Sequence, residues 1–175
     1  MTRGSARTHL TVETKRGLLD CVKLGPASFS VDMGAPRLGW RDIPTRDACA
    51  DTRAIDLAFD PGDAPVLSQP GLVSMGNPHA VFFVADADRY DLDRVGPPLE
   101  THAQFPDRAN IGFAQILAPD HIKLRVWERG AGITRACGSG ACAALVAAAR
   151  RGLTARAATV SLPGGDLKIE WRDDD

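Results

Sequence analysis

The 175-residue sequence lacks the features that mark nucleic-acid-binding, membrane and secreted proteins. Its formal net charge is only −1 and it has no block of like charges, which argues against a nucleic-acid or membrane-surface partner. No apolar run approaches the length of a membrane span, and the segment 1–17 lacks the apolar stretch of a signal peptide. We therefore expect a cytoplasmic protein with one domain and at most one more small lobe.

Cysteine is scarce, and the four cysteines do not form a metal-binding or disulfide pattern. Cys21, Cys49, Cys137 and Cys142 include no C-x-x-C pair, and no pair of histidines has zinc-finger spacing. The sequence also lacks the glycine-rich fingerprints G-x-x-x-x-G-K-[ST] and G-x-G-x-x-G of nucleotide-binding loops. Reduced thiols, with no metal and no nucleotide cofactor, are the expectation.

What the sequence does contain is a series of short extended runs and one long helical run. Alternating or apolar runs between Gly and Pro turns predict strands at 9–14, 17–24, 28–33, 54–59, 81–84, 109–117, 121–130, 158–163 and 166–171. We expect a turn at Gly76-Asn77-Pro78 and one short helix that ends before Gly96. The run 138–151 predicts a helix closed by Gly152, and its apolar residues lie all around it, so the helix should be enclosed.

Cys137 stands at the start of this enclosed helix and is followed by Gly138, Ser139 and Gly140. The unpaired amides and the positive dipole end at a helix start bias a thiol toward the thiolate, and they suit a bound carboxylate or phosphate. The glycines let a ligand approach the backbone closely. The competing interpretation is a buried cysteine chosen for its size, which Cys142 inside the helix fits well. For Cys137 the flanking glycines favour a functional thiol.

Polar residues near the predicted strand ends are further candidates. Glu128 and Arg129 end the run that starts at residue 121, where a carboxylate could tune a thiol and a guanidinium could bind a ligand carboxylate. His79 and Asn110 each precede an apolar strand. Taken singly, each of these patterns is also typical of solvated or capping residues.

The segment ERGAGITRACGSGACAA at 128–144 resembles the second-cysteine signature of diaminopimelate epimerase. Four more segments resemble that family in the same order: VDMGAP at 31–36, GNPHAVFFV at 76–84, FPDRANIGF at 105–113 and GGDLKIEW at 164–171. The resemblance implies an α+β fold in which a strongly curved, mostly antiparallel sheet wraps around one buried central helix. It also implies an isomerase that needs no cofactor and converts LL- to meso-diaminopimelate for lysine and peptidoglycan precursor biosynthesis, as a homodimer in the full-length family.

The resemblance implies a role for each candidate residue. Two cysteines act on opposite faces of the substrate α-carbon, one removing the proton as thiolate and the other delivering a proton as thiol. Cys137 would be one of these catalytic groups, with His79 and Glu128 setting the protonation of the thiols. Ser139 replaces the threonine that is usual in the family and keeps the hydroxyl. The substrate-binding residues would be Asn77, Asn110, Glu128, Arg129, Gly138 and Ser139.

The sequence departs from the family in lacking a CGNG-like segment for the first catalytic cysteine. Neither Cys21 nor Cys49 lies beside a glycine turn. We therefore expect a truncated member with three parts: 1–37 as the tail of the missing N-terminal domain, 38–163 as the C-terminal epimerase domain, and 164–175 as a return strand to the N-terminal domain. Because inversion needs a proton donor on the far face, we expect little or no turnover from this chain alone.

Two alternatives remain open at this stage. One is a related proline or hydroxyproline racemase-type isomerase, although Glu128-Arg129 together with GNPH favours diaminopimelate. The other is a non-catalytic binding or assembly module with the same fold. In either case, strands that lack pairing partners would leave exposed edges, so we expect partial self-association.

Overall fold

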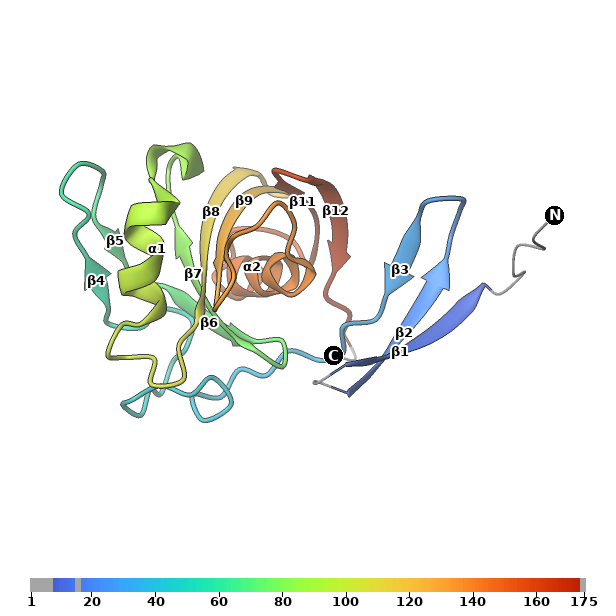
Figure 1. Cartoon of the computed structure of the whole chain (residues 1–175), viewed down its shortest axis with the longest axis horizontal. Helices are drawn as coiled ribbons and strands as arrows, with labels where there is room; N and C mark the ends of the chain where they lie inside the picture. The colour runs from blue at the N-terminus through green and yellow to red at the C-terminus, as the bar shows by residue number, and fades with distance from the viewer. Residues whose placement is uncertain (1–7, 15–16, 174–175) are drawn as a thin grey trace. The chain divides into compact units, whose positions relative to one another are not determined.

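The first of two units in the chain holds a three-stranded antiparallel sheet. The computed structural model describes residues 8–14 and 17–173 and groups the chain into the units Met1–Ala35 and Pro36–Asp175 (Figure 1). The sheet is formed by β1 (His9–Thr14), β2 (Gly17–Lys23) and β3 (Phe29–Val31), in the order β1-β2-β3. The strands predicted at 9–14, 17–24 and 28–33 are therefore confirmed.

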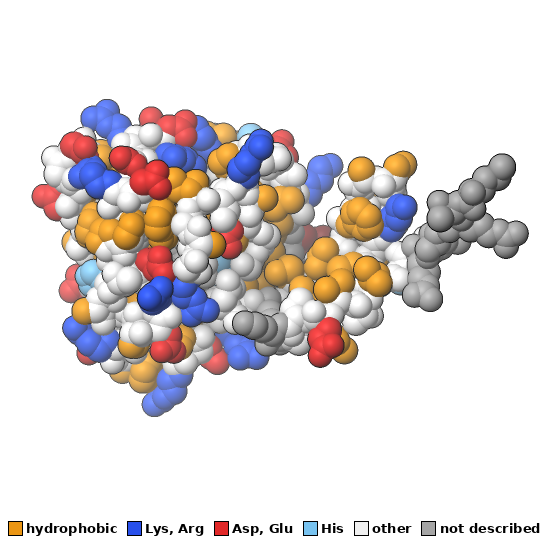
Figure 2. Space-filling model, in the orientation of Figure 1, with side chains coloured by type: hydrophobic (Ala, Val, Ile, Leu, Met, Phe, Trp, Pro, Cys, Tyr) orange, Lys and Arg blue, Asp and Glu red, His pale blue; other side chains and the backbone are white. Residues whose placement is uncertain are grey.

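One face of this sheet is apolar and exposed. Strand register and alternation place six apolar side chains on it, beside Thr14 and Lys23. We call these six the β1–β3 face: Leu10, Val12, Leu19, Cys21, Phe29 and Val31. Leu10 is 58% exposed and Phe29 61% exposed. Figure 2 shows hydrophobic side chains gathered on the surface of this unit.

The second unit is built on a seven-stranded, mostly antiparallel sheet. Its order is β12-β11-β9-β8-β7-β6, with β10 paired to β9, and only the pairs β7·β8 and β9·β11 are parallel. The strands are β6 (Gly71–Ser74), β7 (Pro78–Phe83), β8 (Asn110–Ala118), β9 (His121–Glu128), β10 (Gly132–Ile133), β11 (Ala157–Leu162) and β12 (Gly165–Glu170). The sheet curves around the helix α2 (Gly138–Arg150), as Figure 1 shows, and this confirms the expected α+β fold class.

The helix α2 is enclosed because its side chains are small and almost all apolar. Residues 140–141 and 143–148 are buried, and Gly152 closes the helix end with φ +68°. The close approach to the sheet is visible at Gly71 of β6, where an added Cβ would lie 3.2 Å from the Ala147 Cβ. No helix in the described part of the chain is long and apolar enough to cross a membrane.

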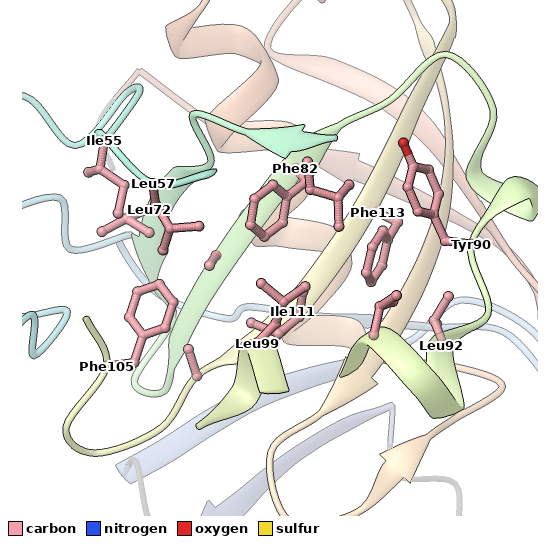
Figure 3. Close-up of a cluster of buried hydrophobic side chains, with 14 of the residues drawn as sticks. Ile55, Leu57, Leu72, Phe82, Tyr90, Leu92, Leu99, Phe105, Ile111 and Phe113 are labelled. Carbon is pink, nitrogen blue, oxygen red and sulfur yellow. The ribbon is translucent and has the colours of Figure 1, made fainter. Parts of the chain in front are cut away.

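A second apolar layer covers the opposite face of β7 and β8 (Figure 3). Phe82 and Phe113 face this layer, whereas Val81 is paired with Gly71 and so shares the face that meets α2. The layer is completed by α1 (Leu92–Glu100), by the short 3-10 helix η1 (Ala87–Arg89), and by the two-residue strands β4 (Ala58–Phe59) and β5 (Leu67–Ser68). Both faces of β7 are therefore buried, as its continuous apolar run predicts.

The expected short helix is present, but its end was predicted wrongly, because α1 continues past Gly96 through Pro97 and Pro98 to Glu100. The two prolines remove two intrahelical hydrogen bonds, but both prolines are exposed, and so are Asp93 and Arg94, the residues whose carbonyls lose a donor. The opposite side carries Leu92, Val95 and Leu99 into the apolar layer. Packing on that side outweighs the local stop signal.

The strand predicted at 54–59 is also shorter than expected. Only Ala58 and Phe59 pair, with β5, while Ile55 and Leu57 are buried in the apolar layer of Figure 3 without joining a sheet. Their backbones still bond the neighbouring segment, because the Ile55 amide donates to the Pro70 carbonyl at 3.1 Å and the Leu57 carbonyl accepts from the Gln69 amide at 2.8 Å. The apolar pattern therefore reflects burial beside an irregularly paired segment.

The three-part division of the chain remains a prediction. In this structure β12 pairs along its whole length with β11, and residues 36–175 form one compact unit.

Candidate active site

Cys137 caps the start of α2. Its backbone has φ −144° and ψ 99°, the extended conformation of a helix N-cap, and its Sγ accepts a hydrogen bond from the Gly140 amide at 3.3 Å. The Ser139 Oγ lies 3.7 Å from the Sγ. The residue is only 6% exposed, so the thiol is held inside the curved sheet at the open end of the helix.

The pKa of Cys137 is raised above its ordinary value, which contradicts the expected bias toward thiolate. Burial is the largest cause, because desolvation disfavours the charged thiolate. Hydrogen bonds from the Gly140 amide and the Ser139 hydroxyl act in the opposite direction, but the charge of Glu128 and its hydrogen bond with the thiol raise the pKa further. At neutral pH Cys137 is therefore a thiol.

Glu128 reaches the thiol because the chain folds back directly after β9. Gly132 of β10 pairs with Glu128, and the Thr134 Oγ1 donates a hydrogen bond to the Glu128 Oε1 at 2.5 Å. Thr134 orients the carboxylate, and sequence reasoning missed it, because only the pairing of β10 brings it back to Glu128. The one sequence signal for Thr134 is that a residue with a hydroxyl group stands three positions before Cys137.

Asn77, in the turn between β6 and β7, approaches the same helix start, and His79 lies beside it in β7. The Asn77 Nδ2 donates to the Ser139 Oγ at 3.4 Å, and the Asn77 Oδ1 and the His79 Nε2 are 3.0 Å apart. His79 is 2% exposed. The turn predicted at Gly76-Asn77-Pro78 is confirmed, and it joins His79 to the Cys137 neighbourhood through Asn77 and Ser139.

Asn110 and Arg129 form an adjoining group. The buried Asn110 amide donates to the Pro78 carbonyl at 2.7 Å and accepts from the Arg129 backbone amide at 3.0 Å, so it braces β7 against the end of β9. The exposed Arg129 guanidinium donates to the Asp107 carbonyl at 2.9 Å. The substrate-binding roles expected for both residues remain predictions.

Gly138 lies at the open side of the helix start. The residue is exposed, and an added Cβ would meet no atom within 4 Å, so a small ligand has room to approach its backbone. The amides of the first helical residues have no intrahelical acceptor and suit a carboxylate. In the described residues, no group of three or more His, Cys, Asp and Glu side chains is arranged to hold a metal ion.

Comparison with known families supplies the decisive observation, because the model described as "Diaminopimelate epimerase" matches residues 71–175. The chain belongs to the diaminopimelate epimerase family. The matched region contains every candidate site residue, from Asn77 to Ser139.

Curated diaminopimelate epimerases match almost the entire chain. Those of Methylobacterium sp. (strain 4-46), Brucella melitensis biotype 1 and Rhodopseudomonas palustris (strain TIE-1) are 60%, 57% and 56% identical to it. The matches cover 98%, 98% and 100% of this chain, but only 59%, 57% and 60% of the respective relatives. The chain thus spans less than two thirds of the length of these relatives.

Solved structures show the same fold at low sequence identity. A predicted epimerase from Pseudomonas aeruginosa has a TM-score of 0.59 and 18% identity, over 95% of this chain and 60% of that chain. A probable proline racemase from Agrobacterium radiobacter K84 has a TM-score of 0.58 and 14% identity, over 98% of this chain and 54% of that chain. These likenesses concern the fold alone.

Proposed function

We propose that this chain supplies one catalytic thiol of a diaminopimelate epimerase, which interconverts LL- and meso-diaminopimelate without a cofactor. One thiolate takes the α-proton and becomes a thiol, and the carbanion then takes a proton from a second thiol on the opposite face, which becomes a thiolate. The proposal rests on the position of the Cys137 Sγ, which lies against Glu128 at the start of α2. The chain that holds it belongs to this family.

Before the substrate binds, Cys137 carries its proton, so it is the proton donor in the conversion of the LL to the meso isomer. Its raised pKa keeps the proton on the sulfur, so the opposing thiol begins as the thiolate that removes the α-proton. In the reverse reaction Cys137 is the thiolate. The Gly140 amide, which bonds the Cys137 Sγ, then stabilises its negative charge.

The surrounding groups hold the substrate and control the proton. The amides of Gly138 and Ser139 bind the carboxylate at the reacting carbon, where they stabilise the charge that develops on proton removal. The Arg129 guanidinium, which is exposed, binds a carboxylate of the substrate, and Asn77 orients the Ser139 hydroxyl. Glu128 and His79 set the protonation of the thiols.

Inversion requires a second thiol, and no cysteine other than Cys137 lies in a glycine turn in this sequence. We therefore propose that epimerisation needs a further protein segment that carries the opposing cysteine. A cytoplasmic setting, a small-molecule amino-acid substrate and a homodimeric whole enzyme belong to the same proposal.

A chimaera with a relative tests this function. This chain replaces the matching segment of the Methylobacterium sp. (strain 4-46) diaminopimelate epimerase, which is 60% identical over 173 residues. We expect the chimaera to convert LL- into meso-diaminopimelate, and the Cys137→Ala form to be inactive. Cys142→Ala, five residues along the same helix, is the matched control and should remain active. A folded chimaera without epimerase activity, or an active Cys137→Ala form, would refute the proposal.

A further inference from the structure

Glu100, the last residue of α1, is a carboxylate in the interior of the second unit. It is 6% exposed and accepts hydrogen bonds from three donors in two segments of the chain. Its Oε2 accepts from the Trp127 Nε1 at 2.7 Å, and its Oε1 accepts from the Gly130 amide at 3.0 Å and from an Arg108 guanidinium nitrogen at 3.2 Å. A buried carboxylate is unfavourable unless such donors satisfy it, and each of these three donors is held in place by it in turn.

The donors to Glu100 lie beside the candidate site. Trp127 and Gly130 flank Glu128 and Arg129 in the sequence. The Glu100 carboxylate bonds both of them and so fixes the two ends of the corner 127–130. Arg108 is two residues before Asn110, and its φ of +59° is a left-handed conformation that a non-glycine residue rarely adopts. Glu100 therefore holds the corner 127–130 and the segment that runs from Arg108 to Asn110, and these two segments meet at the hydrogen bond between Asn110 and Arg129.

The end of α1 does not need this carboxylate. The Thr101 amide and hydroxyl both bond the Pro97 carbonyl, at 3.2 and 2.9 Å, and so close the helix. One turn before Glu100, a Cβ on Gly96 would lie 2.3 Å from the Trp127 ring. This side of α1 therefore fits Trp127: Gly96 leaves room for the indole ring, and the Glu100 carboxylate accepts the hydrogen bond of the indole N–H.

We propose that Glu100 is a positioning residue for this site. It fixes the corner 127–130, and through that corner it holds Glu128 against the Cys137 thiol and Arg129 beside Asp107. Glu100 touches neither the thiol nor, in the proposed function, the substrate. The relevance of this placement to epimerisation rests on that proposed function.

The test compares Glu100→Gln with wild type in the full chain. An amide keeps the size of the side chain but replaces one acceptor by a donor, so it cannot satisfy both the indole and the Gly130 amide. We expect hydrogen exchange of the Gly130 amide, followed by NMR, to accelerate about tenfold. We also expect the pH profile of Cys137 alkylation to shift to lower pH, because Glu128 no longer stays against the thiol. Asp93→Asn, an exposed acid-to-amide change on the same helix, should alter neither measurement.

A second variant covers the case in which Glu100→Gln does not fold. Trp127→Phe keeps an aromatic ring against Gly96 and removes the donor to Oε2, together with part of the indole ring beside Gly132, and it should change both measurements in the same direction. Unchanged Gly130 exchange and an unchanged alkylation profile in the folded variants would overturn the positioning role. Neither measurement uses substrate. If both change as expected but the chimaera carries out no Cys137-dependent epimerisation, the proposed function fails and the positioning of the thiol environment stands.

Discussion

Glu128 acts on the Cys137 thiol in two ways. Its charge disfavours the thiolate and its hydrogen bond favours the thiol, and both effects add to the larger effect of burial. The carboxylate is itself held by Thr134, so the protonation of the Cys137 sulfur depends on two side chains that the fold-back of β10 brings together.

Replacing Glu128 by Gln should lower the pKa of Cys137. The substitution removes the negative charge and leaves burial unchanged, so the thiolate fraction at neutral pH rises and alkylation by iodoacetamide should accelerate by about three- to tenfold. The measurement is the alkylation rate as a function of pH. Glu170→Gln on the exposed side of β12 is the control and should follow the wild-type curve. A Glu128→Gln profile that is unchanged or shifted to higher pH would show that the carboxylate does not act on the thiol as described.

Cys137 also shows how far local sequence reasoning reaches at the residue scale. The glycines around it and the helix that follows correctly placed it at a helix start, because capping is a property of neighbouring residues. Its protonation was predicted in the wrong direction, because burial and the approach of Glu128 depend on the sheet that encloses α2. Glu100 was missed for the same reason, since its partners lie 8 to 30 residues away.

At the scale of secondary-structure elements, the β11–β12 hairpin supports the segment that leads into α2. The Gly164 amide donates to the Arg135 carbonyl at 2.6 Å, two residues before Cys137. A Cβ at Gly164 would lie 2.7 Å from that carbonyl oxygen, closer than real Cβ contacts. The hairpin turn can therefore press against the approach to the helix only because this residue has no side chain.

Gly164→Ala should destabilise the second unit. Either the hairpin or the segment before Cys137 must shift, and we expect a loss of about 1–3 kcal/mol in the free energy of unfolding. The measurement is urea denaturation followed by circular dichroism. Gly138→Ala is the matched change, because a Cβ there meets no atom within 4 Å, and it should be neutral or stabilising. Equal stability of the two variants would contradict the contact between the hairpin and this segment.

The elements differ in how well the sequence predicts them. The strands β8 and β9, the hairpin β11–β12 and the helix α2 follow their patterns closely, because alternation and turn residues are local signals. The helix α1 does not, because Gly96-Pro97-Pro98 reads as a stop while the packing of Gly96 on Trp127 favours a continuing helix. Where a tertiary contact opposes a local signal, the pattern alone cannot decide.

At the scale of the whole molecule, the β1–β3 face is apolar surface that lies outside the buried core. Leu10, Cys21 and Val31 form one row across the three strands, and Val12 pairs with Leu19 in the next row. Leu10, Phe29 and Val31 are each more than a third exposed. Exposed apolar surface of this kind promotes association.

We expect this chain to self-associate through the β1–β3 face as its concentration rises. The double variant Leu10→Thr, Phe29→Thr retains residues that favour strands but removes apolar area, and it should elute later than wild type in size-exclusion chromatography at high concentration. Leu18→Thr is the control, because Leu18 is 70% exposed but alternates to the opposite face. A wild-type chain that stays monomeric at all concentrations would contradict this prediction.

The central claim for the whole molecule is that Cys137 moves the α-proton of diaminopimelate on one face only. The most direct test is incubation of this chain with meso-diaminopimelate in D₂O, because Cys137 is the thiolate in the reverse reaction, with the α-proton signal followed by NMR and the isomers separated afterwards. We predict slow loss of one of the two α-protons with retention of configuration, without appreciable LL isomer, and no such loss with Cys137→Ala. Substantial formation of the LL isomer by the chain alone, or the same behaviour in wild type and Cys137→Ala, would contradict the claim.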